Sequence, residues 1–109
     1  MSELVLALVN CASKKEASTI VGQVLKRRLA AAANIHAPIE STYHWQDEIQ
    51  TAIEVPVLFK TTRHAFDHLA QLVEQLHSYD TPGVIAMPIE QVNGAYEDWV
   101  IKVTSVVDD

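Results

Sequence analysis

Residues 35–60 read IHAPIESTYHWQDEIQTAIEVPVLFK and contain the pattern most informative about the fold. In its first half, apolar side chains recur with a period of two, at Ile35, Ala37, Ile39, Tyr43 and Trp45. Polar side chains occupy alternate positions, at His36, Glu40, Thr42 and His44. Residues 48–60 again place apolar side chains on one face, at Ile49, Ile53, Val55, Val57 and Phe59. This alternation predicts two half-buried strands, and Gln46-Asp47 predicts the turn of a long antiparallel hairpin.

Two prolines and the length of the hairpin bear on its pairing. Pro38 suits an edge strand, whereas Pro56 removes a donor from the second strand and predicts a bulge or a change of pairing partner. A strand of about 12 residues spans roughly 40 Å, but a helix of about 18 residues spans only roughly 27 Å. The far end, with Tyr43 and Trp45, is therefore expected to extend beyond helical cover and to pair with another chain. The alternative is a free tip whose aromatic rings cover each other.

Before the hairpin, the sequence predicts one strand and one helix. Residues 4–9 are almost continuously apolar, as in a central strand covered on both faces. Ser13 and Glu16 form a capping box, in which each side chain is expected to accept a hydrogen bond from the other residue's amide. An amphipathic helix is expected to run on to about Ala32, with the apolar stripe Ala17, Ile20, Val21, Val24, Leu25 and Leu29.

After the hairpin, the sequence predicts a helix, a strand and a terminal helix. Either Thr61 or Thr62 can cap the first of these helices, which ends before Pro82. Its buried stripe is expected to be Phe66, Leu69, Ala70, Val73 and Leu76. Residues 84–89 read as an edge strand, and Asn93-Gly94 as a turn. The last segment has helical spacing at Tyr96, Trp99, Val100, Val103 and Val107.

The element order is therefore βαββαβ plus a terminal helix. Two helices on one face of an antiparallel four-stranded sheet give an α+β, ferredoxin-like domain, which we expect to occupy residues 1–109 as a single unit. Right-handed crossovers favour the strand order 4-1-3-2, in which the first and third strands lie at the centre.

Composition limits the classes of partner and compartment. The chain has 49% hydrophobic and 20% charged residues, as globular proteins do, and a formal net charge of -6, which argues against nucleic acid. No stretch approaches the roughly 20 apolar residues of a membrane span. The start lacks a basic n-region and is interpreted as a strand and not as a signal peptide. A lone cysteine, Cys11, is compatible with a reducing compartment, so we expect a cytoplasmic protein.

Several side chains are candidates for ligand binding. Cys11 and His77 offer a thiolate and an imidazole, which suit copper or zinc if folding brings them together, although a closed structural site needs more ligands. The alternative is that Cys11 is a small core residue and that His77 compensates a helix dipole. His64 and His68 share one helix face, whereas His36 and His44 lie about 26 Å apart along a strand.

A second group of candidates suits a small organic ligand. An intersubunit cleft is expected to use the side chains Trp45, Lys60, Tyr79 and Trp99, with Lys60 holding an anion. The alternative is that the rings form interface core and that Lys60 pairs with Glu48 or Glu54. The sequence has no nucleophile signature, phosphate-binding glycine loop or dinucleotide fingerprint, so we expect no enzymatic activity.

Five segments carry a family resemblance: VNC at 9–11, RLAAAANI at 28–35, YHWQDEI at 43–49, LFKTT at 58–62 and LHSYDTP at 76–82. Together they resemble the CutA family of divalent-cation tolerance proteins. The resemblance implies a trimer built by intersubunit sheet pairing, an architecture similar to that of PII signalling proteins, and a link to copper and other divalent metals. It also implies Cys11 and His77 as copper ligands, while the family's adjacent histidine and second cysteine are replaced here by Leu76 and Ala32.

Three functions follow as hypotheses. The first is a homotrimeric, non-enzymatic metal-response protein that binds copper or another divalent cation without an obligatory cofactor. The second is a PII-like signalling module that binds a small anionic effector between subunits. The third is an assembly unit, because some eukaryotic relatives are associated with anchoring acetylcholinesterase; the absence of a signal peptide argues against this role.

Overall fold

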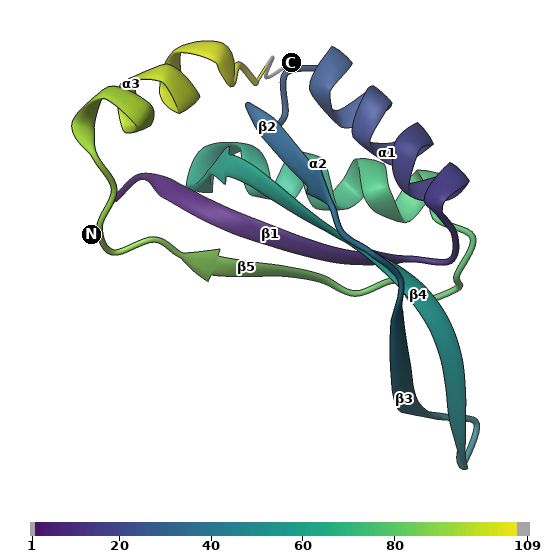
Figure 1. Cartoon of the computed structure of the whole chain (residues 1–109). Coiled ribbons are helices and arrows are strands. Elements are labelled where there is room, and N and C mark those ends of the chain that lie inside the picture. Colours follow the sequence, from purple (N-terminus) through teal and green to yellow (C-terminus); the bar gives the residue numbers. More distant parts are fainter. Residues whose placement is uncertain (1, 107–109) are drawn as a thin grey trace.

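The computed structural model of the chain describes residues 2–106 (Figure 1). Its elements are β1 Leu4–Cys11, α1 Lys14–Lys26, β2 Ala32–Ile35, β3 Ile39–Trp45, β4 Glu48–Thr62, α2 Arg63–Leu76, β5 Val84–Pro88 and α3 Gly94–Val103. The sheet is antiparallel and has the order β2-β4-β1-β5, with β3 pairing with the far half of β4. The predicted α+β fold and strand order are therefore confirmed. Val107, expected in the last helix, lies outside the described residues.

The core lies between the sheet and the helices α1 and α2, which Figure 1 shows along one side of the sheet. Alternate side chains of β1 and β4, including Val9, Val57 and Phe59, pack there against Ile20 of α1 and Leu69 of α2. Such burial is the main source of stability in a domain of this size. It also fixes where the ends of β1 and α2 meet.

The helix α1 is shorter than predicted, since it ends at Lys26 and not near Ala32. Arg28 adopts a left-handed conformation with φ 56°, which breaks the helix. The following alanines enter β2, where Ala32 pairs with Lys60 of β4. Sheet pairing thus overrides the helix propensity of the alanine run.

The helix caps agree with the sequence in part. The Ser13 hydroxyl accepts from the amide of Glu16, as predicted, and Thr62 caps α2 by accepting from the amide of Ala65. Thr61 instead donates to the Leu29 carbonyl at 2.6 Å. Asn93 is the residue before α3, so the predicted turn is the start of that helix.

The hairpin turn is the one that the sequence predicts. Gln46 and Asp47 have φ of 50° and 64°, and Trp45 pairs with Glu48 across them. Two successive residues with positive φ form the type I′ turn, whose twist matches that of paired strands.

The expected strand over residues 35–45 is divided into β2 and β3. Ile35 pairs with Val57, but Ile39 pairs with Glu54, so three residues of one strand lie opposite two of β4. This extra residue is a bulge opposite Pro56, which confirms the expectation of a change in pairing there. The extra residue also changes which side chains of β3 lie on which face of the hairpin, since a shift of one residue along a strand exchanges its two faces. The prediction that Ile35 and Trp45 share one face is therefore wrong.

The far half of the hairpin extends beyond the helices, as Figure 1 shows. Ile49 and Ile53 are 70% and 62% exposed there, which confirms that the hairpin is longer than its helical cover. Leu76, predicted to be buried in the stripe of α2, is 37% exposed at the helix end. Within residues 2–106, none of the helices is long and apolar enough to cross a membrane.

Candidate functional site

Three side chains that can bind metals meet where β1 ends and α2 ends. Cys11 is the last residue of β1, Glu16 lies in the first turn of α1, and His77 directly follows α2. The thiol, carboxylate and imidazole each offer an atom, and these atoms lie within 4.8 Å of one another. Cys11 and His77 are buried, and the Glu16 side chain is 13% exposed. We call these three residues the Cys-Glu-His cluster.

Hydrogen bonds hold Glu16 in this cluster. Its Oε2 accepts from the Ala12 amide at 2.8 Å, and its Oε1 accepts from the Ser78 amide at 2.8 Å. The sequence predicted that the Glu16 side chain would accept from the Ser13 amide, so this half of the capping box is wrong. Glu16 therefore links the start of α1 to the segment that follows α2.

Hydrogen bonds also define which ring nitrogen of His77 carries the proton. Its Nδ1 accepts from the Tyr79 amide at 3.1 Å, and its Nε2 lies 2.8 Å from the Asn10 carbonyl oxygen. An amide can only donate and a carbonyl can only accept, so the ring proton sits on Nε2. The imidazole is thus neutral in this arrangement, with Nε2 3.6 Å from Glu16 Oε2.

The environment of the cluster sets the protonation of its acids. Burial, and then the charges of Glu16 and Glu54, raise the pKa of the Cys11 thiol to about 12. Burial alone would raise the pKa of Glu16 as well, but hydrogen bonds from Ala12 and Ser78 and the proximity of His77 lower it overall. At neutral pH the cluster therefore contains a protonated thiol at Cys11 and an ionised carboxylate at Glu16.

The donor atoms of the cluster fit a copper ion or a borderline divalent ion. Sulfur and imidazole nitrogen favour copper and zinc over magnesium and calcium, and a carboxylate adds charge. Each Glu16 oxygen has a second lone pair, so it can keep its amide bond while binding an ion. The Cys11 thiol and the His77 Nε2 must each first give up a proton.

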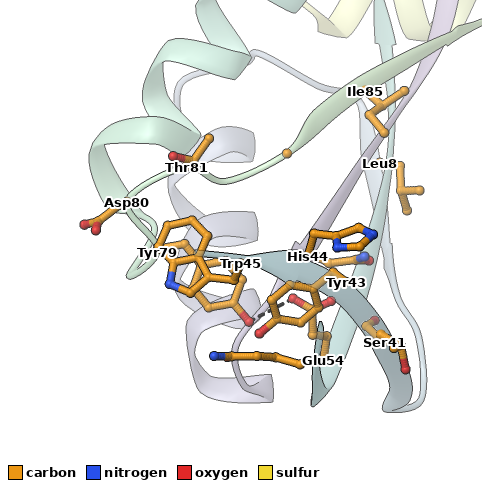
Figure 2. Close-up of a pocket in the computed structure, with 14 residues that line it drawn as sticks. Leu8, Ser41, Tyr43, His44, Trp45, Glu54, Tyr79, Asp80, Thr81 and Ile85 are labelled. Carbon is orange, nitrogen blue, oxygen red and sulfur yellow. Dashed lines mark hydrogen bonds between the residues drawn. The ribbon is translucent and has the colours of Figure 1, made fainter. Parts of the chain in front are cut away.

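A cleft of about 800 Å³ lies close to the cluster, between the hairpin and the segment after α2 (Figure 2). Its aromatic lining consists of Tyr43, Trp45 and Tyr79, and its carboxylates are Glu54 and Asp80. The bulge makes this arrangement, because it turns Tyr43 and Trp45 to the same face of the hairpin as Glu54. The Tyr79 hydroxyl donates to Glu54 Oε2 at 2.8 Å.

Within one chain, the four residues predicted for an intersubunit cleft do not all lie together, and their arrangement between subunits stays a prediction. Trp45 and Tyr79 line the cleft, whereas Lys60 and Trp99 are not among its lining residues. Lys60 pairs with Leu6 and lies six positions from Glu54 along β4, or about 20 Å. Trp99 lies on α3 beside Tyr96, with ring centroids 5.6 Å apart.

Of the other two histidine pairs, His64 and His68 are placed as their spacing predicts, whereas His36 and His44 do not share one strand. His64 and His68 lie one turn apart on α2, with ring centroids 6.4 Å apart. His36 lies between β2 and β3, whereas His44 lines the cleft.

Residues 5–103 match the family described as CutA1 divalent ion tolerance protein. The chain belongs to the CutA1 family. It is 41% identical over 100 residues to the divalent-cation tolerance protein CutA of Thermus thermophilus, covering 92% of this chain and 95% of that protein. It is 38% identical over 103 residues to human protein CutA, covering 94% of this chain but 58% of the longer human protein.

Solved CutA structures agree with the fold. The Thermus thermophilus CutA1 structure superposes with a TM-score of 0.91 at 37% identity, covering 94% of this chain and 99% of that one. A structure from Archaeoglobus fulgidus, described as a periplasmic CutA, gives 0.90 at 31% identity over 94% and 99% of the two chains. The family and its Thermus thermophilus member are both described by tolerance of divalent ions.

The CutA fold brings together two residues that sequence reasoning paired and adds one that it missed. Cys11 and His77 meet, and Glu16 joins them. The available signal was the capping box, since a carboxylate in the first turn after β1 must lie near the end of that strand. Ala32 pairs with Lys60 and Cys11 with Val55, so these two positions are about 16 Å apart along β4. A cysteine at position 32 would therefore lie outside this cluster.

Replacing Glu16 by glutamine should lower the free energy of unfolding at pH 7 by about 1–3 kcal/mol, because the carboxylate accepts two backbone hydrogen bonds. The pKa of Glu16 is lowered in the folded state, so this stabilisation is present above about pH 4.5 and is lost as the pH falls through the folded pKa. Denaturant unfolding of both proteins at pH 7 and pH 3 measures the difference. Glu74→Gln, on the exposed face of α2, is the control. If Glu16→Gln lowered the free energy of unfolding equally at pH 7 and pH 3, the prediction would be wrong.

Proposed function

We propose that this CutA protein binds copper or another divalent cation at the Cys-Glu-His cluster and acts in metal tolerance. The observation that carries the proposal is the meeting of a thiol, a carboxylate and an imidazole within 4.8 Å. Three protein ligands leave a coordination position open, as suits an ion that is bound reversibly. The family's description supports a role with divalent ions.

Each residue of the cluster has a separate role in this proposal. The ionised Glu16 attracts the cation, and the Cys11 thiolate provides the preference for copper or zinc. His77 contributes Nε2, which must release its bond to Asn10. If the ring proton moves to Nδ1, the bond from the Tyr79 amide is lost as well. Metal uptake is therefore linked to the segment that carries Tyr79 into the cleft.

We also propose that the chain works as a single-domain homotrimer in the cytoplasm. The exposed hairpin supports self-association, because apolar side chains lie on both of its faces, Ile49 and Ile53 on one and Ile39, Tyr43 and Trp45 on the other. The outer edges of β3 and β5 offer backbone groups for intersubunit pairing. Relatives are described as periplasmic or chloroplastic, so the compartment varies within the family.

The alternative of an anionic effector has less support. The cleft lining contains Glu54 and Asp80 and, among residues 2–106, neither lysine nor arginine. Lys60, the residue expected to hold the anion between subunits, lies elsewhere on β4 of the same chain.

Native mass spectrometry of the metal-stripped protein tests both proposals, since it gives the number of subunits and the ions bound to each. We expect a trimer that takes up one zinc(II), or one copper(I) under reducing conditions, for each chain. Competition with a chromophoric chelator should show that Cys11→Ser weakens binding by at least about tenfold, because even indirect changes around metal ligands cost 10–100-fold.

His77→Ala should weaken binding similarly, and His36→Ala is the matched control because His36 lies outside the cluster. Unchanged affinity in Cys11→Ser would remove the cluster as the metal site. A monomer in the mass spectrum would overturn the trimer without affecting the metal proposal.

A further inference from the structure

A second cavity, of about 570 Å³, lies between the end of α1, one face of α2 and the segment that follows α3. Its volume falls within the range of about 300–1,000 Å³ that ligand pockets usually have. Figure 1 shows α1 and α2 along one side of the sheet, away from the projecting hairpin. No described lining residue belongs to the hairpin or to β5, so the cavity is separate from the surfaces that we assign to subunit contact. The wall from α2 consists of side chains at helical spacing: His68, Gln71, Leu72 and Gln75.

The cavity carries positive charge in an acidic protein. Lys26, Arg27 and Arg28 line it together with His68, whereas its described lining contains neither aspartate nor glutamate. The whole chain has 8 lysine and arginine residues against 14 aspartate and glutamate residues, so three of its cations gather at one place. A site with this charge attracts anions and repels metal cations.

Helix capping explains only part of this charge. A basic side chain in the last turn of a helix compensates the partial negative charge of the helix end, and Lys26 occupies that turn in α1. Arg27 is the C-cap residue, and Arg28 follows it. Arg28 has a left-handed φ of 56°, at a position where glycine is the usual residue. The two arginines therefore add cations beyond the one that the end of α1 requires.

Hydrogen bonds hold Arg28 at the cavity. Its Nη1 donates to the Val103 carbonyl at 3.3 Å, and its own carbonyl accepts from the Ser105 amide at 2.9 Å. These bonds fix the segment after α3 against the end of α1, so this wall is formed before a ligand arrives. The bond to Val103 uses one of the five N–H donors that a guanidinium has.

The chemistry of the lining narrows the class of anion. Arginine donors match two oxygens of a phosphate group, and lysine binds phosphate as a point charge. The amides of Gln71 and Gln75 and the hydroxyl of Ser105 add neutral donors. A phosphate compound with several negative charges therefore suits the cavity better than a single carboxylate.

We propose that this cavity binds a small molecule through a diphosphate group, whose oxygens are held by Lys26, Arg27 and Arg28. The cavity shares no residue with the Cys-Glu-His cluster, so this binding goes beyond the metal function proposed above. It also differs from the intersubunit cleft that the sequence predicted around Lys60, because it is formed within one chain.

Isothermal titration calorimetry of the intact, metal-stripped protein with pyrophosphate tests the proposal, and succinate serves as an anion without phosphate. At an ionic strength of about 0.01 M we expect one pyrophosphate for each chain and at least about tenfold weaker binding of succinate. The affinity should fall at about 0.15 M, because the Debye length shortens from about 30 Å to about 8 Å. No binding of pyrophosphate, or equal affinities for the two anions, would overturn the proposal.

Arg27→Gln should weaken pyrophosphate binding by about tenfold, because it removes a charged hydrogen-bond donor. Lys15→Gln is the matched control, since it removes one charge from the opposite end of α1, outside the cavity lining. If Arg27→Gln does not fold, Lys26→Gln provides the second variant. Losses of equal size in the cavity variant and in Lys15→Gln would show that only net charge matters, which would exclude this cavity as the site.

The chain continues after Val106 with two aspartates, Asp108 and Asp109, which lie outside the described residues. Carboxylates so close to the cavity along the chain would compete with an added anion. The Asp108→Asn/Asp109→Asn protein should therefore bind pyrophosphate as tightly as the unaltered protein or more tightly. Weaker binding by this variant would contradict attraction by the cations of the cavity and would overturn the proposal.

Discussion

Replacing Phe59 by alanine should lower the free energy of unfolding by about 3–5 kcal/mol. Phe59 is fully buried in the second half of β4 and, among residues 2–106, is the largest of the fully buried side chains. Its neighbours across the sheet are Ala7 of β1 and Ala33 of β2, which leave room for the ring. Removing the ring therefore opens a cavity that these small side chains cannot fill. Guanidinium unfolding at one fixed protein concentration measures the loss.

Phe59→Leu is the matched control for this result. It keeps most of the apolar volume and should cost less than about 1.5 kcal/mol. An unchanged dependence on denaturant would show that the alanine variant differs in stability and not in compactness. A loss below about 1 kcal/mol for Phe59→Ala would mean that β1, β4 and the helices repack around the site, contrary to the core described above.

Raising the pH from 7.0 to 8.5 should strengthen zinc binding about thirtyfold, or tenfold for each pH unit. Burial and the charges of Glu16 and Glu54 raise the pKa of Cys11 to about 12, so the thiol is protonated throughout this range. The thiolate is the form that binds metal, and its fraction rises tenfold for each pH unit below the pKa. Competition titrations with a chelator of known pH dependence measure the affinity.

The proton that the Cys11 thiol releases on zinc binding can be measured directly. Calorimetric titrations in buffers of different ionisation enthalpy should show about one proton released for each zinc ion bound. Cys11→Ser should bind weakly and lose this dependence on pH, because it has no thiol to ionise. An affinity of the unaltered protein that does not change between pH 7.0 and 8.5 would exclude Cys11 as a ligand.

Local sequence determined several features of this protein. The alternation of residues 35–60 predicted the hairpin, and Gln46-Asp47 predicted its turn. The Ser13 cap and the amphipathic stripe of α1 also appear as predicted. These features depend on neighbours within a few positions along the chain, so they can be inferred from spacing and residue type.

Tertiary structure alone decided which side chains meet. One extra residue opposite Pro56 reversed the face of Trp45, and so directed Tyr43 and Trp45 toward Glu54 and not toward the core. Glu16 joined Cys11 and His77 because α1 and α2 pack on the same sheet beside the end of β1. Lys60 lies away from the cleft of its own chain because it is six positions from Glu54 along the extended β4. Local patterns therefore predict the type and order of most elements, whereas long-range pairing register and helix packing, which no local pattern records, set the ends of α1 and β2 and both candidate sites.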